Sequence, residues 1–283
     1  MVKKERLDVI LTERGLFETR EKAKRAIMEG IVFSKEERLE KPGVKVPVDI
    51  EITIKGKKMP YVSRGGYKLE KALKTFDLNI KDKIMIDIGA STGGFTDCAL
   101  QNGVRYSYAV DVGYNQLAWK LRNDDRVIVM ERTNFRYIKP EDLTRDMPEF
   151  ASIDVSFISL KLMLPPLKKL LVDGSDVVAL IKPQFEAGRE FVGKKGIVRD
   201  PKVHMQVIQE IIDFAIAEGY DVQNLTFSPI TGGEGNIEFL IHLKWRVKDE
   251  SEQGKNFLNI KVNDVVQSAH EQFKEGKIQN SVN

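Results

Sequence analysis

The spacing of apolar residues changes near residue 60, which predicts two modules. Over residues 6–30, apolar side chains recur at helical spacing in two short segments that stop at Gly15 and Gly30. Short apolar segments typical of strands follow at 31–33, 44–48 and 50–54. The polar segment 55–60 breaks the pattern and is predicted to be a linker. We therefore expect a small α+β domain at residues 1–59.

From Tyr61 onward, apolar runs of strand length alternate with helical patterns. Strands are predicted at 83–88, 106–112, 127–131, 151–155, 176–181, 222–227 and 237–243. Helices are predicted at 95–100, 160–171 and 203–218. Because a Gly-rich turn joins the last two strands without a helix, we expect an α/β domain at residues 60–247. Its sheet should be seven-stranded and mostly parallel, with one antiparallel strand near the edge.

The tail at residues 248–283 is polar apart from one helical face. That face carries Val262, Val266, Ala269 and Phe273, which predicts a helix able to dock on the larger domain. No chemical motif falls in the tail, so the sequence assigns no function to it.

Composition and charge narrow the class of protein. The 283 residues are 42% hydrophobic and 31% charged, as in soluble proteins with a buried core. The single cysteine, Cys98, excludes a disulfide scaffold and a cysteine-based zinc site, and it favours a reducing compartment such as the cytoplasm. No apolar run approaches the roughly 18 residues of a membrane span.

The positive charge is concentrated in the small domain. Residues 1–59 hold 15 Lys and Arg against 11 Asp and Glu, whereas the rest of the chain holds 30 against 31. This imbalance indicates a polyanionic partner for the first domain. A solvated helix face is the alternative interpretation.

A Gly-rich turn directly follows the first predicted strand of the large domain. Its sequence, Asp87-Ile88-Gly89-Ala90-Ser91-Thr92-Gly93-Gly94-Phe95, has neither the Gly-x-Gly-x-x-Gly of a dinucleotide site nor the Gly-Lys-Ser/Thr of a phosphate loop. An acid before the turn would repel phosphate but suits an amino group. Asp111 and Asn134 end the next two strands, where they could bind ribose hydroxyls and an adenine edge.

Together these residues resemble the S-adenosylmethionine site of a Rossmann-like methyltransferase. A plain strand–helix turn is the alternative. The predicted cofactor-binding residues are Asp87, Gly89, Ser91, Thr92, Gly93, Gly94, Phe95, Asp111, Asn134 and Asp154.

Ionisable residues occur where the predicted strands should be apolar. Asp154 and Lys182 follow strands, and Glu238 lies inside the predicted strand 237–243. Unpaired buried charges are costly, so such residues are usually functional or form structural ion pairs. A lysine near a sugar hydroxyl could act as a base or polarise that hydroxyl.

The sequence fits other methyl acceptors less well than a sugar hydroxyl. Methylation at C5 of a pyrimidine needs a cysteine nucleophile, and Cys98 is better explained as a core residue. Methylation of an exocyclic amine commonly uses Asp/Asn-Pro-Pro-Tyr/Phe, whereas Asp154-Val155-Ser156-Phe157 lacks the prolines.

With Lys68, these charged residues form a set that resembles the Lys–Asp–Lys–Glu tetrad of FtsJ-like ribose 2′-O-methyltransferases. The first domain resembles the S-four-type RNA-binding domain through Arg6-Leu7-Asp8, Arg14-Gly15, Thr19-Arg20, Ala23, Ile27, Gly30 and Lys41-Pro42-Gly43. It departs from that pattern at Ser34-Lys35-Glu36-Glu37, where an Asn-Gly turn is usual.

The two modules together resemble the TlyA (hemolysin A) family of ribosomal RNA methyltransferases. The segments specific to it are Tyr61-Val62-Ser63-Arg64-Gly65-Gly66, Lys182-Pro183-Gln184-Phe185-Glu186, Gly196-Ile197-Val198-Arg199-Asp200 and Gly232-Gly233-x-Gly235-Asn236-x-Glu238.

The resemblance implies a reaction and a partner. S-adenosylmethionine would methylate a ribose 2′-hydroxyl, on cytidine, in ribosomal RNA or a ribosomal subunit, and no metal is required. Lys182 would accept or polarise the hydroxyl proton, Asp154 and Glu238 would hold its ammonium, and Lys68 would position the target and favour the lower-pKa form of Lys182.

RNA contacts are expected from Arg6, Arg20, Lys22, Lys24, Arg25 and Arg64, because phosphates are bound mainly by basic side chains. Phe157 and Phe185 are candidates to stack a splayed base, with a core role as the alternative. The segment 186–199 is a candidate cover for the nucleotide.

Three other functions stay open. They are an RNA-binding protein with an inactive methyltransferase-like body, a membrane-active hemolysin, and a base or protein methyltransferase. The sequence lacks a hydrophobic span, and all four tetrad positions are filled. It indicates no oligomeric state.

Overall fold

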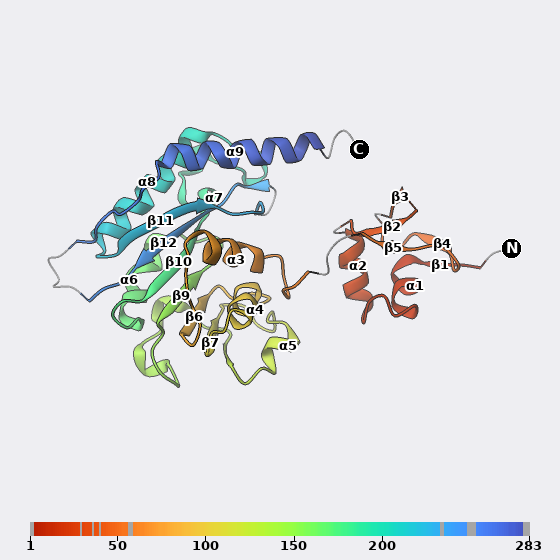
Figure 1. Cartoon of the computed structure of the whole chain (residues 1–283), viewed down its shortest axis with the longest axis horizontal. Coiled ribbons are helices and arrows are strands. Elements are labelled where there is room, and N and C mark those ends of the chain that lie inside the picture. Colours follow the sequence, from red (N-terminus) through yellow and green to blue (C-terminus); the bar gives the residue numbers. More distant parts are fainter. Residues whose placement is uncertain are drawn as a thin grey trace. The chain divides into compact units, whose positions relative to one another are not determined.

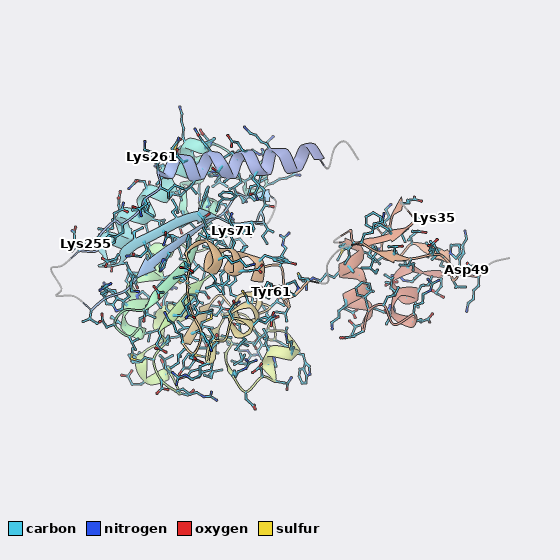
Figure 2. All side chains as sticks on the ribbon, in the orientation of Figure 1. Lys35, Asp49, Tyr61, Lys71, Lys255 and Lys261 are labelled. Carbon is cyan, nitrogen blue, oxygen red and sulfur yellow. The ribbon has the colours of Figure 1, made fainter. Side chains whose placement is uncertain are left out.

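The computed structural model describes residues 3–28, 30–35, 37–39, 41–55, 59–232, 235–247 and 253–279. The chain divides into two compact units, Met1–Met59 and Pro60–Asn283 (Figure 1). Figure 2 shows the side chains of each unit on its ribbon.

The first unit is a small α+β domain. It contains β1 (Lys4–Arg6), α1 (Leu7–Glu13), α2 (Arg20–Met28), β2 (Val32–Ser34), β3 (Glu37–Arg38), β4 (Lys45–Pro47) and β5 (Thr53–Ile54). Strand β1 pairs with β4, and β2 lies between β3 and β5. Leu7, Leu11 and Ile27 are fully buried between the helices and strands. The sequence pattern missed β1 and β3 because strands of two or three residues carry no readable alternation.

The second unit is built on one seven-stranded sheet. Its strands are β6 (Ile84–Ile88), β7 (Tyr106–Val110), β8 (Val127–Met130), β9 (Phe150–Ile153), β10 (Asp176–Ile181), β11 (Asp221–Phe227) and β12 (Phe239–Lys244). They lie in the order β11-β12-β10-β9-β6-β7-β8. Only β12 runs against its neighbours in this sheet, and it lies one position from the edge. The predicted fold is confirmed.

Helices cover both faces of this sheet. The main ones are α3 (Gly66–Thr75), α4 (Gly94–Gln101), α5 (Trp119–Arg122), α6 (Leu164–Leu167), α7 (Pro183–Glu186), α8 (Pro201–Ala217) and α9 (Val262–Gln279). Met85 of β6 packs among residues of α3 and α4, while Ile84 and Ile86 pack among residues of α6, α8 and α9. Successive strand residues thus pack against opposite layers of helices, so the strands are mostly apolar on both faces.

Two predicted elements differ from the structure. The helix expected at 160–171 is instead a 3₁₀ turn (Leu160–Leu162), α6 and a second 3₁₀ turn (Lys168–Leu170). Pro165 and Pro166 lack the N–H groups that a continuous helix needs. Glu238 was expected inside the last strand but lies just before β12.

The tail helix α9 packs on α8 and β11. Val266 and Ala269 are fully buried there, and the Phe273 ring meets Phe227 of β11 edge-on at 6.3 Å. The ammonium of Lys71, labelled on α3 in Figure 2, lies 3.6 Å from the centre of the same Phe227 ring. Within the described part of the chain, no helix has both the length and the apolar character to cross a membrane.

Candidate active site

One edge of the sheet collects the charged residues that interrupt its apolar pattern. Asp154 directly follows β9, and Lys182 directly follows the parallel neighbour β10. Strand β12 runs the other way, with Phe239 paired to Ile181, so Glu238 reaches the same edge from the start of its strand. The reversal of one strand therefore brings residues from three strand ends together.

Lys68 reaches this edge from helix α3. The start of α3 lies against the start of α4, so closely that a Cβ on Gly94 would fall 2.3 Å from Ser63 Oγ. A Cβ on Gly66 would likewise fall 2.4 Å from the Tyr61 ring. Gly94 thus allows the two helices to meet, and Gly66 leaves room for the Tyr61 ring beside the start of α3. Lys68 extends from this part of α3 to the sheet edge.

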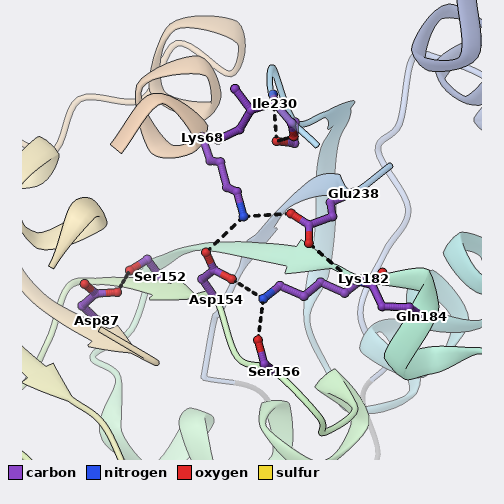
Figure 3. Close-up of polar contacts among 10 residues, drawn as sticks. Lys68, Asp87, Ser152, Asp154, Ser156, Lys182, Gln184, Ile230 and Glu238 are labelled. Atoms are coloured by element: carbon purple, nitrogen blue, oxygen red, sulfur yellow. Dashed lines mark hydrogen bonds and ion pairs between the residues drawn. The ribbon is translucent and has the colours of Figure 1, made fainter. Parts of the chain in front are cut away.

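The four charged residues form one connected cluster (Figure 3). Lys182 Nζ lies 2.6 Å from Asp154 Oδ1, and Lys68 Nζ lies 3.3 Å from Asp154 Oδ2. Lys68 Nζ also lies 2.8 Å from Glu238 Oε2. The side chains are at most 18% exposed, so these are largely desolvated ion pairs.

Mutual attraction keeps Lys68 and Asp154 charged. Burial alone would lower the pKa of Lys68, but the carboxylates of Asp154 and Glu238 outweigh it and raise that pKa above the ordinary value. Burial likewise favours the neutral form of Asp154, yet Lys68 and Lys182 hold its pKa below the usual range. Asp154 is therefore a carboxylate at neutral pH.

The pairing differs from the predicted one at Glu238. Glu238 was expected to hold the ammonium of Lys182, but its carboxylate binds Lys68 and accepts a hydrogen bond from Gln184 Nε2 at 3.4 Å. The cause is the position of Lys68 above the sheet edge, between the two acids. Lys182 instead binds Asp154 and donates to Ser156 Oγ at 3.1 Å.

Two cavities meet at this cluster. One, of about 500 Å³, is lined by all four tetrad residues, and the other, of about 550 Å³, is lined by Asp111 and Asn134. Both volumes fall within the roughly 300–1,000 Å³ typical of small-molecule sites. The residues that line both are Gly89, Ser91, Asp154, Ser156 and Phe157. Asp154 thus stands between a cofactor-sized cavity and a tetrad-lined one.

The Gly-rich turn shapes the wall between the cavities. Gly89 has a φ of 83°, and a Cβ there would lie 2.4 Å from the carbonyl oxygen of Asp154. Only glycine meets both conditions without displacing the tetrad. Ser91, Thr92, Gly94 and Phe95, which are also predicted cofactor-binding residues, line the first cavity.

Two predicted cofactor-binding residues do not reach either cavity. The Asp87 carboxylate is fully buried and accepts hydrogen bonds from the backbone N–H and hydroxyl of Thr96 and from Ser152 Oγ. Burial raises its pKa to about 6. A Cβ on Gly93 would lie 2.2 Å from Leu121 Cδ1, so this glycine serves packing. Asp87 and Gly93 both support the turn from the side that faces away from the cavities.

The second cavity offers the groups that an adenosine would need. Asp111 accepts hydrogen bonds from the backbone N–H groups of Ser91 and Gly113, both at 2.7 Å, which fixes its carboxylate at the cavity wall. A carboxylate has lone pairs left for two ribose hydroxyls. Asn134 accepts from the N–H of Arg136 and lines the same cavity. The donor set therefore fits S-adenosylmethionine, which brings hydroxyls and amino groups but no phosphate.

Two of the predicted RNA-binding residues of the first unit, Arg6 and Arg20, form ion pairs with Asp8. The Asp8 carboxylate is fully buried and binds Arg6 and Arg20, both at 3.0 Å, so these arginines hold its pKa down at about 2. Arg6 and Arg20 remain 41% and 48% exposed. Lys22 pairs with Glu18 and Lys24 with Glu21 along α2, while Arg25 lies on the same helix. Arg64 lies in the second unit and lines the tetrad cavity.

Comparison with known proteins identifies the family. Residues 61–245 match the model of the FtsJ-like methyltransferases, and residues 5–52 match the S4 domain. The chain is 38% identical over 245 residues to the 16S/23S rRNA (cytidine-2′-O)-methyltransferase TlyA of Mycobacterium tuberculosis, covering 86% of this chain and 91% of the relative. It is 43% identical over 237 residues to Hemolysin A of Brachyspira hyodysenteriae, covering 84% and 98%. The chain belongs to the TlyA family of FtsJ-like methyltransferases.

Further relatives agree with membership of the TlyA family. YqxC of Bacillus subtilis is 67% identical over 275 residues, 97% of each chain. A solved structure of a hemolysin-type protein from Streptococcus thermophilus shares 54% of its sequence and superposes with a TM-score of 0.77, covering 98% of this chain and 99% of that one. The predicted methyltransferase class and S-adenosylmethionine cofactor are confirmed, and the S4 domain supports RNA as the substrate.

Sequence reasoning missed several residues of this TlyA-family site. Ser156 was read only as part of an incomplete motif, yet its hydroxyl binds Lys182. Gly232 makes room for the tetrad, since a Cβ there would lie 2.1 Å from Glu238 Oε1. The signal for Gly232 was its place in the family-specific segment before Glu238. No local signal marked Ser156.

Proposed function

We propose that this protein methylates the 2′-hydroxyl of a ribose in ribosomal RNA, with cytidine as the target nucleoside. The single observation that carries the proposal is the tetrad at the junction of the two cavities, with Asp154 contacting both lysines at 2.6 and 3.3 Å. The cytidine and the ribosomal RNA come from the activity named for the TlyA relatives. The S4 domain supplies the RNA-binding surface.

In the mechanism, Lys182 handles the proton of the 2′-hydroxyl. Its Nζ lies at the cavity wall, where the ammonium paired with Asp154 Oδ1 would polarise the hydroxyl. Once that ammonium has lost a proton to solvent, the neutral amine would accept the hydroxyl proton, and Asp154 Oδ1 would accept a hydrogen bond from the ammonium so formed. Lys68, held by Glu238, keeps Asp154 ionised and so keeps that acceptor available. When bound, S-adenosylmethionine supplies a methyl group activated by the positive charge on its sulfur.

The mouth of the site carries an exposed aromatic side chain suited to the target base. Phe157 is 90% exposed, so its alternative role as a core residue is wrong. Its φ of 63° is unusual for phenylalanine and directs the chain back at the end of the Asp154–Phe157 segment. The ring lies 4.9 Å from that of Phe185, and both line the tetrad cavity. A flipped base could stack on this pair.

The geometry argues against the other methyl acceptors. The Cys98 thiol is fully buried and does not line either cavity, and burial raises its pKa to about 12, so it is no nucleophile for C5 methylation. For an inactive RNA-binding body, the tetrad should be incomplete or dispersed. It is instead complete and connected.

The test is to incubate the protein with S-adenosylmethionine and transcripts of 16S and 23S ribosomal RNA, then to identify the methylated nucleoside by mass spectrometry. We expect 2′-O-methylcytidine from the wild type and almost none from Lys182→Ala, which should still bind cofactor and RNA. Lys161→Ala is the matched control, because Lys161 pairs with Glu210 away from both cavities. A methyl group on a base, or full turnover in Lys182→Ala, would refute the proposal.

A further inference from the structure

The tail helix α9 lies outside the FtsJ-like match, which ends at residue 245, yet it is hydrogen-bonded to the core of the second unit. His270 of α9 lies beside His204 of α8, with His270 Nε2 3.0 Å from His204 Nδ1. His204 is fully buried, and its Nε2 lies 3.2 Å from the carbonyl oxygen of Val198. The tail is thus linked to the segment that precedes α8.

The chemistry of the three groups fixes the direction of these bonds. A carbonyl only accepts, so His204 Nε2–H donates to Val198, and Nδ1 of the neutral ring must accept. Burial lowers the pKa of His204 to about 4, so the ring is neutral near pH 7. His270 Nε2–H is then the donor to His204 Nδ1. Loss of that donor leaves a buried acceptor without its partner.

The same linkage continues to the tetrad cavity. The Val198 N–H donates to Asn236 Oδ1 at 3.1 Å, and Asn236 Nδ2 donates to the Gly196 carbonyl at 2.9 Å. Asn236 is 3% exposed and lines the cavity that contains Glu238. A buried amide therefore holds both ends of the short segment from Gly196 to Val198.

This segment closes a tight turn that presents one lysine to the cavity. Gly193 and Ile197 form an isolated bridge, and Lys195 between them has a φ of 68°. That backbone conformation is strained for lysine and persists only where neighbouring contacts impose it. Lys195 lines the cavity, whereas its neighbour Lys194 does not. Among the residues that the structure describes, no carboxylate forms an ion pair with Lys195.

We propose that His270 is a positioning residue for RNA methylation: through His204, Val198 and Asn236 it fixes the turn from which Lys195 binds a phosphate of the target nucleotide. The inference rests on the proposed function for the identity of the ligand. It assigns the tail helix a role in substrate binding. It also gives Lys195 a contact with the target nucleotide, in contrast to the cations that bind RNA elsewhere on the protein. A lysine with no acidic partner at the wall of a substrate cavity suits a phosphate group.

The test compares full-length variants by their Kd for in vitro transcripts of 16S and 23S ribosomal RNA over a range of salt concentrations. Lys195→Ala should weaken binding roughly tenfold. It should also reduce the slope of log Kd against log salt by about 0.7–0.9, the signature of one lost phosphate contact. His270→Leu should weaken binding about threefold to fivefold, with cofactor binding unchanged. KM for RNA should rise in both variants more than kcat falls.

Three comparisons separate positioning from general destabilisation. His270→Gln places an amide donor where Nε2 was and should restore binding. Gln267→Ala changes an exposed residue on the same helix, and Lys194→Ala removes a charge from the same turn without touching the cavity. Neither should reproduce the loss.

The decisive outcome is the double variant. If His270 acts through Lys195, His270→Leu should add little to Lys195→Ala, because the contact it positions is already absent. A full additional loss in the double variant, or wild-type Kd and KM in His270→Leu, would overturn the inference. Because Kd is measured without turnover, it tests the role of His270 in RNA binding even if the wild type methylates a group other than a ribose hydroxyl.

Discussion

Replacing Asp154 with Asn removes the carboxylate that joins both lysines of the tetrad. The side chain keeps its shape, so the change isolates the charge. Asp154 lies 2.6 Å from Lys182 Nζ and 3.3 Å from Lys68 Nζ. At an effective dielectric of about 20, unit charges at these distances attract by roughly 5–6 kcal/mol. Desolvation of all three groups offsets much of that attraction.

The loss in free energy of unfolding in Asp154→Asn is therefore smaller than the Coulomb energy. Removing one partner from a buried ion pair costs about 3–5 kcal/mol, since the remaining charge stays buried. In a domain of this size, each kcal/mol shifts the melting temperature by about 2–4 °C. The melting temperature should fall by roughly 6–20 °C. Because Lys182 also loses its hydrogen-bond acceptor, kcat for methyl transfer should fall at least about 100-fold.

A matched control lies at the other end of strand β10. Asp176 also joins two lysines, at 2.8 Å to Lys83 and 3.3 Å to Lys244, and it lies 3.0 Å from His242 Nε2. Its side chain is 9% exposed, against 18% for Asp154. Asp176→Asn should destabilise the protein by a similar amount but leave kcat within about threefold at a temperature where both variants are folded. Differential scanning fluorimetry and a methyl-incorporation assay measure the two effects. Equal losses of kcat in the two variants would show that the tetrad acts only through stability.

Further predictions concern the cofactor cavity, its supporting loop and the target base. Gly89→Ala should weaken binding of S-adenosylmethionine at least about tenfold by isothermal titration, because its Cβ would fall 2.4 Å from the Asp154 carbonyl oxygen. Gly174→Ala has the same left-handed backbone strain, about 1–2 kcal/mol, but open space around it and should bind normally. Glu131 accepts hydrogen bonds from three backbone N–H groups of the loop after β7 and pairs with Arg122, so its pKa falls to about 2. A lowered pKa stabilises the fold above about pH 5 and ceases to do so as the pH falls towards 2, so urea unfolding of Glu131→Gln should show less acid destabilisation than the wild type. Phe157→Ala should reduce kcat/KM for RNA about 5–150-fold, the effect of losing 1–3 kcal/mol of stacking. The exposed Trp119, which lines neither cavity, supplies the control Trp119→Ala.

The strand directions and the sheet edge could be predicted from the sequence because both depend on local signals. Each strand is a short apolar run, and the absence of a helix between the last two runs indicates the reversed strand. Parallel strands carry their carboxyl ends to one edge, so Asp154 and Lys182 could be expected together. The same reasoning placed Asp111 and Asn134 at a common cavity, as the structure has them.

The roles of Asp87 and Phe157 were harder to predict, because they depend on which way a side chain turns at the end of a strand. Asp87 is the fourth residue of β6, and its carboxylate points to Thr96 and Ser152 instead of the cavity. Phe157 follows a strand end, and its apolar side chain suggests a core residue. It has a positive φ, and its side chain is 90% exposed; no pattern of apolar residues predicts either feature.

The pairing within the tetrad depends on contacts far apart in the sequence. The local pattern placed Glu238 inside the last strand, and the family resemblance made Lys182 its expected partner. The structure instead puts Lys68 between the two acids, because the glycine at 94 lets the start of helix α3 lie close against α4. Lys68 is 170 residues from Glu238 along the chain. The four residues of the tetrad could thus be identified from the sequence, whereas the ion pairs among them depend on how closely helices α3 and α4 pack.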